Sequence, residues 1–246
     1  MPDLNKNVFS WYSPHLEQET HLVRWGHFGK PVLLFPTAGG DAEEVERFHL
    51  IGAVGDLIMS GRIKVYSIDS VAGRTWLSGE HSPEFCSRVQ NLFDMYIYKE
   101  VVPAIRKDCA SPDIDIIATG ASIGAFNAVA SLCRHPDAFS LAIGMSGTFD
   151  LSKYLQGRMN DDFYFSSPVH YLPGLKESPL LEALRKRMIL LPTGEGRWED
   201  VGESWRLAAI LGEKGIPNRV DPWGVDYDHN WVTWRAMLPR YLAEYS

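Results

Sequence analysis

The feature that most constrains the fold of this chain is a repeated alternation of short apolar runs with amphipathic stretches, separated by turns rich in glycine and proline. A run that is apolar at every position fits a strand covered on both faces, as in a parallel sheet. An amphipathic stretch fits a helix packed on such a sheet. The alternation of the two therefore predicts an α/β fold. The continuous runs are Pro31–Pro36, Ile63–Ile68, Ile114–Ala118, Leu141–Met145 and Met188–Leu191, and Asn218–Trp223 is a further candidate.

Two earlier segments, Val8–Ser13 and His21–Gly26, alternate apolar with polar residues, as half-buried antiparallel strands do. The chain is therefore predicted to form one α/β domain over residues 1–246. We expect a mostly parallel central sheet of about eight strands flanked by helices, with ligands bound beyond the carboxyl ends of the strands. The expected helices are Ala42–Ser60, Ser87–Arg106, Ile123–Arg134, Ser178–Lys186, Glu203–Lys214 and Trp231–Tyr241.

Composition argues against several function classes. The chain carries 24 basic and 31 acidic side chains, a formal charge of −7, without the clustered Lys and Arg of a nucleic-acid-binding surface. Its apolar runs are far shorter than the roughly 18 residues of a membrane span, and its first residues lack the apolar core of a signal peptide. Three widely spaced cysteines indicate reduced thiols and a cytoplasmic protein. No two histidines have the spacing of metal ligands, so we expect neither a metal nor a cofactor.

A nucleophile motif follows the run Ile114–Ala118. The sequence Gly120-Ala121-Ser122-Ile123-Gly124 leads directly into an amphipathic stretch, which gives Gly-x-Ser-x-Gly between a strand and a helix. A sharp turn that lifts a serine above a sheet brings the residues two before and two after it against neighbouring backbone, where side chains would clash. The helix N-terminus also favours developing negative charge. Ser122 is therefore the candidate nucleophile, and Gly120 and Gly124 are the glycines that allow the turn.

With this motif, the order of elements and the late Asp228-His229-Asn230-Trp231, the chain resembles an α/β-hydrolase. More narrowly, it is similar to the esterase branch that includes esterase-D-like enzymes and mycolyltransferases. The resemblance extends from about Val8 to Leu242 and is strongest around Ser122 and His229. It implies an α/β-hydrolase fold with a catalytic triad in the chain order Ser, acid, His.

His229 is the expected general base. A serine hydroxyl needs a base within hydrogen-bond reach, and that base needs an orienting acid. His229 follows the last predicted strand, and the resembling enzymes carry a comparable histidine there. His135 and His170 compete, but both precede the segment in which the acid is expected.

The acid is expected directly after Met188–Leu191, where three carboxylates compete. Glu199 is favoured because the preceding Gly-x-Gly turn would fold back and present a residue after it to the histidine. Asp200 is the second choice and Glu195 the third. The resembling families place an Asp or a Glu at varying depths here, so the resemblance does not decide between them.

Acyl transfer also needs hydrogen-bond donors aimed at the developing oxyanion. One is expected to be the backbone N–H of Ile123, the residue after the nucleophile. The other is expected from the loop Pro36–Gly40. Related enzymes often have His-Gly there, whereas this chain has Phe35-Pro36, which leaves the register open by one residue. Thr37 is the candidate and Ala38 the alternative.

These residues predict a serine carboxylic-ester hydrolase that forms an acyl-enzyme and uses water to release it. Small, short-acyl esters are expected because Leu151–Arg187, in the usual lid position, is too short for a large cap domain. The expected partner is a small-molecule ester, with no nucleic acid and no membrane, and the sequence carries no indication of the oligomeric state. Two alternatives stay open: an acyltransferase with the same triad, and an inactive hydrolase fold that serves as a binding module.

Overall fold

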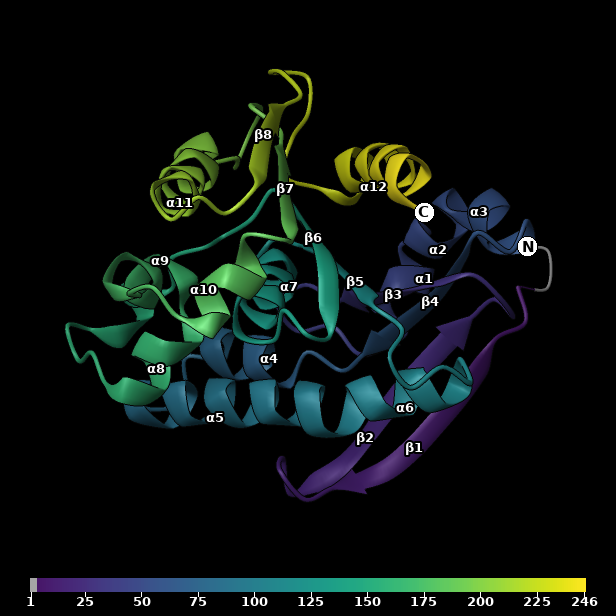
Figure 1. Ribbon diagram of the computed structural model, residues 1–246, viewed down its shortest axis with the longest axis horizontal. Coiled ribbons are helices and arrows are strands. Elements are labelled where there is room, and N and C mark those ends of the chain that lie inside the picture. The colour runs from purple at the N-terminus through teal and green to yellow at the C-terminus, as the bar shows by residue number, and fades with distance from the viewer. Residues whose placement is uncertain (1–3) are drawn as a thin grey trace.

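The computed structural model describes residues 4–246 and contains an eight-stranded sheet in the order β1-β2-β4-β3-β5-β6-β7-β8. β2 pairs antiparallel with β1 and β4, and every other neighbouring pair is parallel. The mostly parallel α/β sheet predicted from the sequence is therefore confirmed (Figure 1). The strands are β1 Asn7–Ser13, β2 Gln18–Trp25, β3 Lys30–Phe35, β4 Ile63–Ile68, β5 Ile116–Ala121, β6 Phe139–Met145, β7 Met188–Thr193 and β8 Asn218–Pro222.

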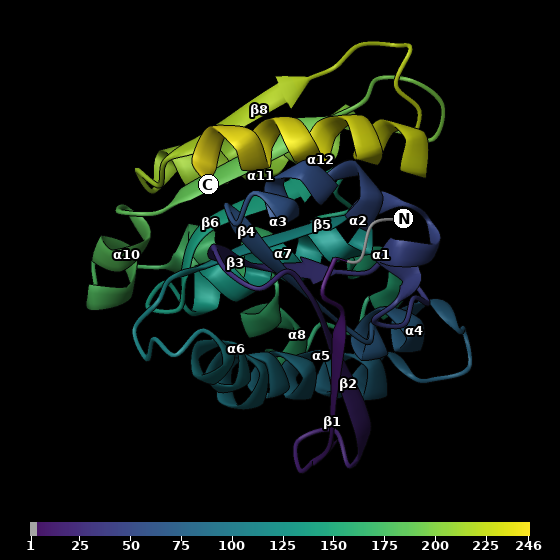
Figure 2. The same ribbon diagram turned by 90° about the vertical axis from the view of Figure 1, so that its right-hand side faces the viewer.

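Helices cover both faces of the sheet, as Figures 1 and 2 show from two directions. One face carries α1 Glu44–Arg47, α2 Leu50–Ala53, α3 Gly55–Met59 and α12 Trp231–Tyr245. The other side of the molecule carries α4 Val71–Leu77, α5 Pro83–Tyr96, the π-helix η1 Ile97–Val101, α6 Val102–Asp108, α7 Ile123–Arg134, the 3₁₀ turn η2 Ser152–Leu155, α8 Asp161–Ser166, α9 Pro168–Tyr171, the 3₁₀ turn η3 Leu172–Gly174, α10 Pro179–Leu184 and α11 Val201–Glu213.

A hydrophobic core lies on each face of the sheet, and the central strands contribute side chains to both. This explains why the sequences of these strands are apolar at every position. In β3, Leu33 and Phe35 pack into the core beneath α5 and α7, whereas Val32 and Leu34 pack into the core beneath α12. β3, β4 and β5 are buried along almost their whole length. The loops that follow these buried strands leave the sheet at its carboxyl edge.

Two predicted helices have different bounds in the structure. The single helix expected over Ala42–Ser60 is wrong: the segment forms α1, α2 and α3, because His49 adopts a left-handed φ of 62° between the first two. The helix expected over Ser87–Arg106 begins earlier, where the Ser82 hydroxyl caps α5, and widens into η1 before α6. Pro103 lies at the start of α6 and has no N–H to donate to the preceding turn, which accounts for the change in helix type.

The strand expected over Ile114–Ala118 is shifted and longer. β5 starts at Ile116 and continues to Ala121, in register with β6 so that Ala121 faces Met145. The strand therefore ends at the residue directly before Ser122, and the serine stands at the carboxyl edge of the sheet.

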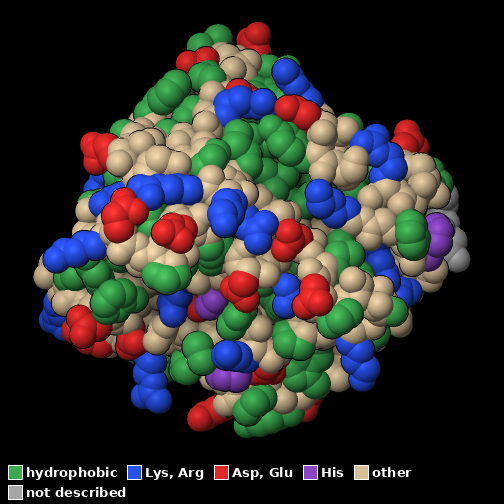
Figure 3. Space-filling model, in the orientation of Figure 1, with side chains coloured by type: hydrophobic (Ala, Val, Ile, Leu, Met, Phe, Trp, Pro, Cys, Tyr) green, Lys and Arg blue, Asp and Glu red, His purple; other side chains and the backbone are tan. Residues whose placement is uncertain are grey.

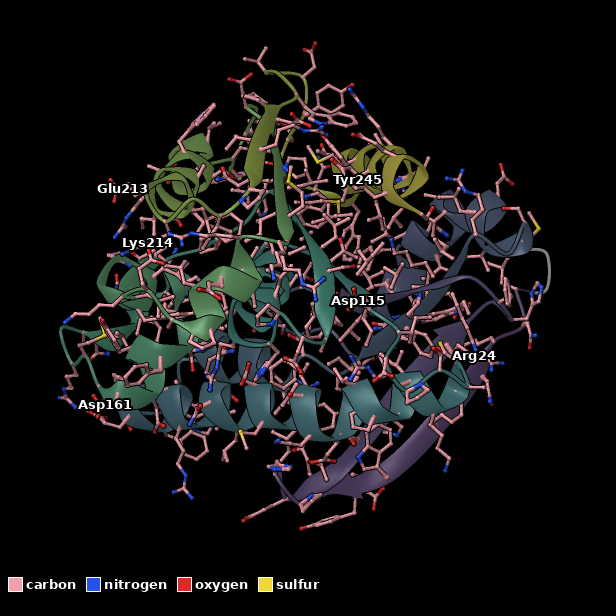
Figure 4. All side chains as sticks on the ribbon, in the orientation of Figure 1. Arg24, Asp115, Asp161, Glu213, Lys214 and Tyr245 are labelled. Carbon is pink, nitrogen blue, oxygen red and sulfur yellow. The ribbon has the colours of Figure 1, made fainter. Side chains whose placement is uncertain are left out.

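The segment in the lid position contains only short helices, α8 to α10 with the 3₁₀ turns η2 and η3. The segment is bonded to the end of α11, because the Lys214 ammonium donates to the carbonyl oxygens of Pro173 at 2.8 Å and Leu175 at 2.9 Å. Figure 4 labels Lys214 at the end of α11, beside this segment. The expectation of no large cap agrees with this arrangement.

The surface mixes charges of both signs. On the face seen in Figure 3, acidic and basic side chains are interspersed rather than gathered by sign. Within residues 4–246, no helix is long and apolar enough to cross a membrane. In the same part of the chain, no group of three or more His, Cys, Asp or Glu side chains is placed to hold a metal ion.

Candidate active site

Ser122 occupies a sharp turn between β5 and α7. Its backbone has φ 57° and ψ −123°, a conformation that costs free energy for any residue other than glycine. The turn is held by its surroundings: the Ser122 N–H donates to the Met145 carbonyl at 3.0 Å, and the Ser122 carbonyl accepts from the Thr148 N–H at 3.3 Å. The serine is half-buried. Its neighbours thus fix it above the carboxyl edge of the sheet, as the nucleophile motif predicts.

The two motif glycines allow close backbone contacts on either side of the serine. A Cβ atom on Gly120 would lie 2.5 Å from backbone atoms of Gly124, and one on Gly124 would lie 2.6 Å from the carbonyl oxygens of Phe35 and Pro36. No side chain fits at these separations. The first turn of α7 therefore lies directly against the loop that follows β3, which brings Ser122 next to the candidate oxyanion donors.

Glu199 is the carboxylate that faces His229. Its Oε2 atom lies 3.6 Å from His229 Nδ1, and its side chain is only 1% exposed, compared with 23% for His229. The Ser146 hydroxyl donates to Glu199 Oε1 at 2.5 Å, and the Thr193 hydroxyl donates to Oε2 at 3.4 Å. A buried carboxylate held by two hydroxyls and facing an imidazole can orient that ring and stabilise its protonated form.

The two rival carboxylates have other surroundings. Asp200 caps α11 by accepting from the Gly202 N–H at 3.0 Å, and Glu195 is exposed. Asp228, next to the histidine, pairs with Arg197, whose backbone N–H and guanidinium lower the pKa of this carboxyl. Glu199 alone of these four has the contact expected of a triad acid.

The loops after β7 and β8 pack against each other and set the position of His229. The Gly196 N–H donates to the Tyr227 carbonyl, and the His229 N–H donates to the Arg197 carbonyl, both at 3.0 Å. A Cβ atom on Gly194 would lie 2.0 Å from the Tyr227 oxygen. The expected fold-back of the Gly-x-Gly turn is therefore present, and both views of the ribbon show these loops side by side (Figures 1 and 2).

Trp234 on α12 supports the other side of the histidine, with its ring edge-on to the imidazole at a centroid distance of 5.2 Å. Trp231 packs against Trp234 and stacks on Phe48 at 4.7 Å. Within residues 4–246, no hydrogen bond joins the Ser122 hydroxyl to His229. Catalytic hydrogen bonds are often long without substrate and shorten when it binds.

The candidate oxyanion donors differ from the first choice made on sequence. The Thr37 N–H donates to Glu44 Oε2 at 2.8 Å and its hydroxyl donates to Glu44 Oε1 at 2.9 Å, so this amide is already engaged. The amides of Ala38 and Ile123 have no hydrogen-bond acceptor among residues 4–246. Ala38 also packs in the apolar cluster that contains Ile123. The geometry therefore favours the alternative, Ala38, because a contact from α1 occupies Thr37.

The competing histidines have structural partners elsewhere. His135, at the end of α7, lies with Nε2 2.9 Å from the Asp94 carboxylate and stacks on Tyr98 at 4.0 Å. His170 pairs through Nδ1 with the Ser167 hydroxyl at 2.8 Å, and burial lowers the pKa of its imidazole. Neither is bonded to Ser122, Glu199 or His229, although the His170 ring lies edge-on to Phe163 at 5.3 Å.

Three residues near the site were not identified from the sequence: Ser146, Glu44 and Trp234 as the residue beside the histidine. Ser146 directly follows β6 and has a left-handed φ of 47°. A polar residue at the carboxyl end of a buried strand was the available signal for Ser146. Glu44 had no such signal, because its contact with Thr37 depends on how the loop after β3 turns.

Comparisons with known proteins agree with this geometry. The profile of the family described as "Putative esterase" matches residues 73–245, which include Ser122, Glu199 and His229. No curated protein sequence matches the chain.

Solved structures with the same fold are distant in sequence. A ferulic acid esterase aligns with a TM-score of 0.73 and 16% identity over 96% of this chain and 95% of its own. An S-formylglutathione hydrolase from Agrobacterium tumefaciens aligns with a TM-score of 0.71 and 13% identity over 97% and 93% of the two chains. MPT51 of Mycobacterium tuberculosis aligns with a TM-score of 0.70 and 15% identity over 97% of each chain. These similarities establish the α/β-hydrolase fold.

Proposed function

Because this chain belongs to the esterase family of α/β-hydrolases, we propose that it is a serine carboxylic-ester hydrolase with the triad Ser122, His229 and Glu199. The observation that carries the proposal is the buried Glu199 carboxylate facing His229, beside a strained serine turn at the same edge of the sheet. If Glu199 and His229 formed only a structural ion pair, the strained backbone at Ser122 would not be needed. If the residues around Ser122 formed only a glycine turn, the histidine and its acid would not be needed at the same edge of the sheet.

In this mechanism His229 accepts the hydroxyl proton as Ser122 Oγ attacks the ester carbonyl carbon. Glu199 holds the ring through Nδ1 and stabilises the imidazolium that forms. The N–H groups of Ile123 and Ala38 donate to the oxyanion of the tetrahedral intermediate. The intermediate collapses as His229 returns the proton to the departing alkoxide, which leaves an acyl-enzyme. Water, deprotonated by the same histidine, then releases the acid and restores the serine.

Small acyl groups are favoured because apolar side chains already occupy the space around Ile123, the residue after the nucleophile. Trp76 and Phe163 pack edge-on at 5.7 Å in the cluster that contains Ile123, and both are almost fully buried. Leu151 closes the same cluster with 1% exposure. A long acyl chain would have to displace these side chains, whereas an acetyl or propionyl group would not.

Hydrolysis is favoured over transfer to an alcohol because the site is open to water. Ser122 is half-buried and His229 is 23% exposed, so a water molecule can approach the acyl-enzyme. An acyltransferase gains from a drier pocket that excludes water from the intermediate.

The test is hydrolysis of p-nitrophenyl esters from acetyl to decanoyl by the wild type, Ser122→Ala and the control Ser10→Ala, which removes an exposed serine on β1. We expect the shortest esters to be the best substrates and Ser122→Ala to lose roughly three or more powers of ten in kcat. The panel also includes S-formylglutathione and a ferulic acid ester, which appear in the names of two structural neighbours.

Added short alcohols separate hydrolysis from acyl transfer, because a transferase would partition its acyl-enzyme to the alcohol. Equal inactivity of the wild type and Ser122→Ala, together with no labelling of Ser122 by a fluorophosphonate, would overturn the proposal in favour of a binding module.

A further inference from the structure

Within the part of the chain that the structure describes, Glu44 is a buried carboxylate without a cationic partner. Its residue exposure is 8%, and no Lys, Arg or His of residues 4–246 lies within ion-pair distance of it. Its hydrogen-bond donors instead come from Thr37: the N–H at 2.8 Å to Oε2, and the hydroxyl at 2.9 Å to Oε1 and 3.0 Å to Oε2. Burying a charged group is costly unless it is well paired, so a carboxylate in this place points to a role beyond stability.

The loop after β3 is shaped around this carboxylate. A Cβ atom on Gly40 would lie 2.4 Å from Glu44 Cδ, so only glycine lets the carboxylate lie against the turn. The Gly40 N–H donates to the Thr37 carbonyl at 3.3 Å and closes the turn. The N–H of Ser70, the residue directly before α4, donates to the Gly40 carbonyl at 2.9 Å. Both ends of the turn are thereby fixed, and Ala38 lies between them.

We propose that Glu44 is a positioning residue for the oxyanion hole: by holding both donors of Thr37, it fixes the turn that presents the Ala38 N–H beside Ser122. This inference rests on the proposed function. Donors that are fixed before the reaction stabilise the oxyanion without reorganising, which is the main source of their effect on rate. Glu44 acts through the turn and touches no reacting atom.

The test compares Glu44→Leu with the matched control Glu43→Leu. Leucine has nearly the size of Glu44 but removes both acceptor oxygens, whereas glutamine could keep the contacts because the Thr37 hydroxyl can accept as well as donate. Glu43 is the adjacent carboxylate, with a side chain that is 46% exposed and paired with Lys6. Thr37→Val removes the hydroxyl that donates to Glu44, whereas the conservative variant Thr37→Ser keeps a hydroxyl at this position.

Two rates are measured: kcat and KM for p-nitrophenyl acetate, and the second-order rate constant for labelling of Ser122 by a fluorophosphonate, whose phosphoryl oxygen also uses the oxyanion hole. We expect Glu44→Leu to lower kcat and the labelling rate roughly 10- to 100-fold with little change in KM. Thr37→Val should lower both rates less, because the backbone N–H of residue 37 still donates to Glu44. Thr37→Ser should recover most of the Thr37→Val loss, and the double variant Thr37→Val/Glu44→Leu should lose no more than Glu44→Leu alone. Glu43→Leu should match the wild type.

A folded Glu44→Leu variant that labels and turns over at the wild-type rate would overturn the inference, and so would Thr37→Ser as impaired as Thr37→Val. If Glu44→Leu does not fold, the comparison of Thr37→Val with Thr37→Ser decides. Failure of the wild type itself to label at Ser122 would instead refute the proposed function, so the two failures are distinguishable.

Discussion

The substitution Glu199→Gln tests the triad most directly, because the sequence leaves three carboxylates as candidates and the structure brings one of them to the histidine. Glutamine preserves the size of the side chain, and it can keep its contacts with Ser146 and Thr193 because a hydroxyl can accept from the amide NH₂ as well as donate to its oxygen. It removes the charge that faces His229 Nδ1 at 3.6 Å. The variant therefore isolates electrostatic stabilisation of the imidazolium that forms in the transition state.

The magnitude follows from that distance. Two unit charges 3.6 Å apart interact by about 4 to 5 kcal/mol at an effective dielectric constant of about 20, which suits a carboxylate that is 1% exposed and an imidazole that is 23% exposed. This free energy corresponds to a fall in kcat of roughly 10³-fold. Loss of ring orientation adds to it, so a fall of roughly 10³- to 10⁴-fold is expected.

The assay is kcat for p-nitrophenyl acetate, with Asp200→Asn and Glu195→Gln as matched controls and thermal melting to show that each variant is folded. Asp200→Asn should cost some stability through its cap on α11 but little activity, and Glu195→Gln should change neither. A folded Glu199→Gln within tenfold of the wild type, or a fall of roughly 10³-fold in either control, would refute the assignment of the acid.

Three further substitutions probe the surroundings. Gly124→Ala would place a Cβ 2.6 Å from two carbonyl oxygens of the loop after β3, so the melting temperature and kcat should both drop, and an active variant of unchanged stability would contradict the close packing. Ser146→Ala removes the 2.5 Å hydrogen bond to Glu199 and should lower kcat roughly 10-fold or more without changing KM; an unchanged kcat would rule out a positioning role. At Asp108, burial raises the pKa, but hydrogen bonds from Lys64 and Tyr66 outweigh it and leave the pKa below its usual value. A carboxyl with a lowered pKa in the folded state stabilises the fold while ionised, so this contribution is present above about pH 4 and is lost as the pH falls through the lower, folded-state pKa. Urea midpoints of Asp108→Asn should therefore depend less on pH than those of the wild type between about pH 6 and pH 2, and parallel curves would contradict this.

Much of the fold was predictable because the patterns that specify it are local. A strand buried on both faces must be apolar at each position, and β3, β4 and β6 match the predicted runs within one or two residues. The helix bounds were less predictable. A left-handed residue such as His49 and a π-turn before Pro103 divide segments whose periodicity is otherwise helical.

The sequence by itself predicted Ser122 and His229 as the candidate nucleophile and base, because the strained turn needs Gly120 and Gly124 within two residues of the serine, and the fold leaves one histidine after its last strand. Proposing one acid and one second oxyanion donor required the tertiary structure. Glu199 and Asp200 are neighbours in sequence, and only the packing of the β7 loop on the β8 loop buries the first and exposes the second.

In the same way, the contact of Thr37 with Glu44 engages one amide of the β3 loop, whereas the next amide, that of Ala38, has no acceptor among the described residues 4–246. The physical reason is shared by both choices. Glycine spacing and hydrophobic periodicity depend on a residue's near neighbours in the chain, whereas the direction of a loop side chain depends on contacts with segments that are distant in sequence.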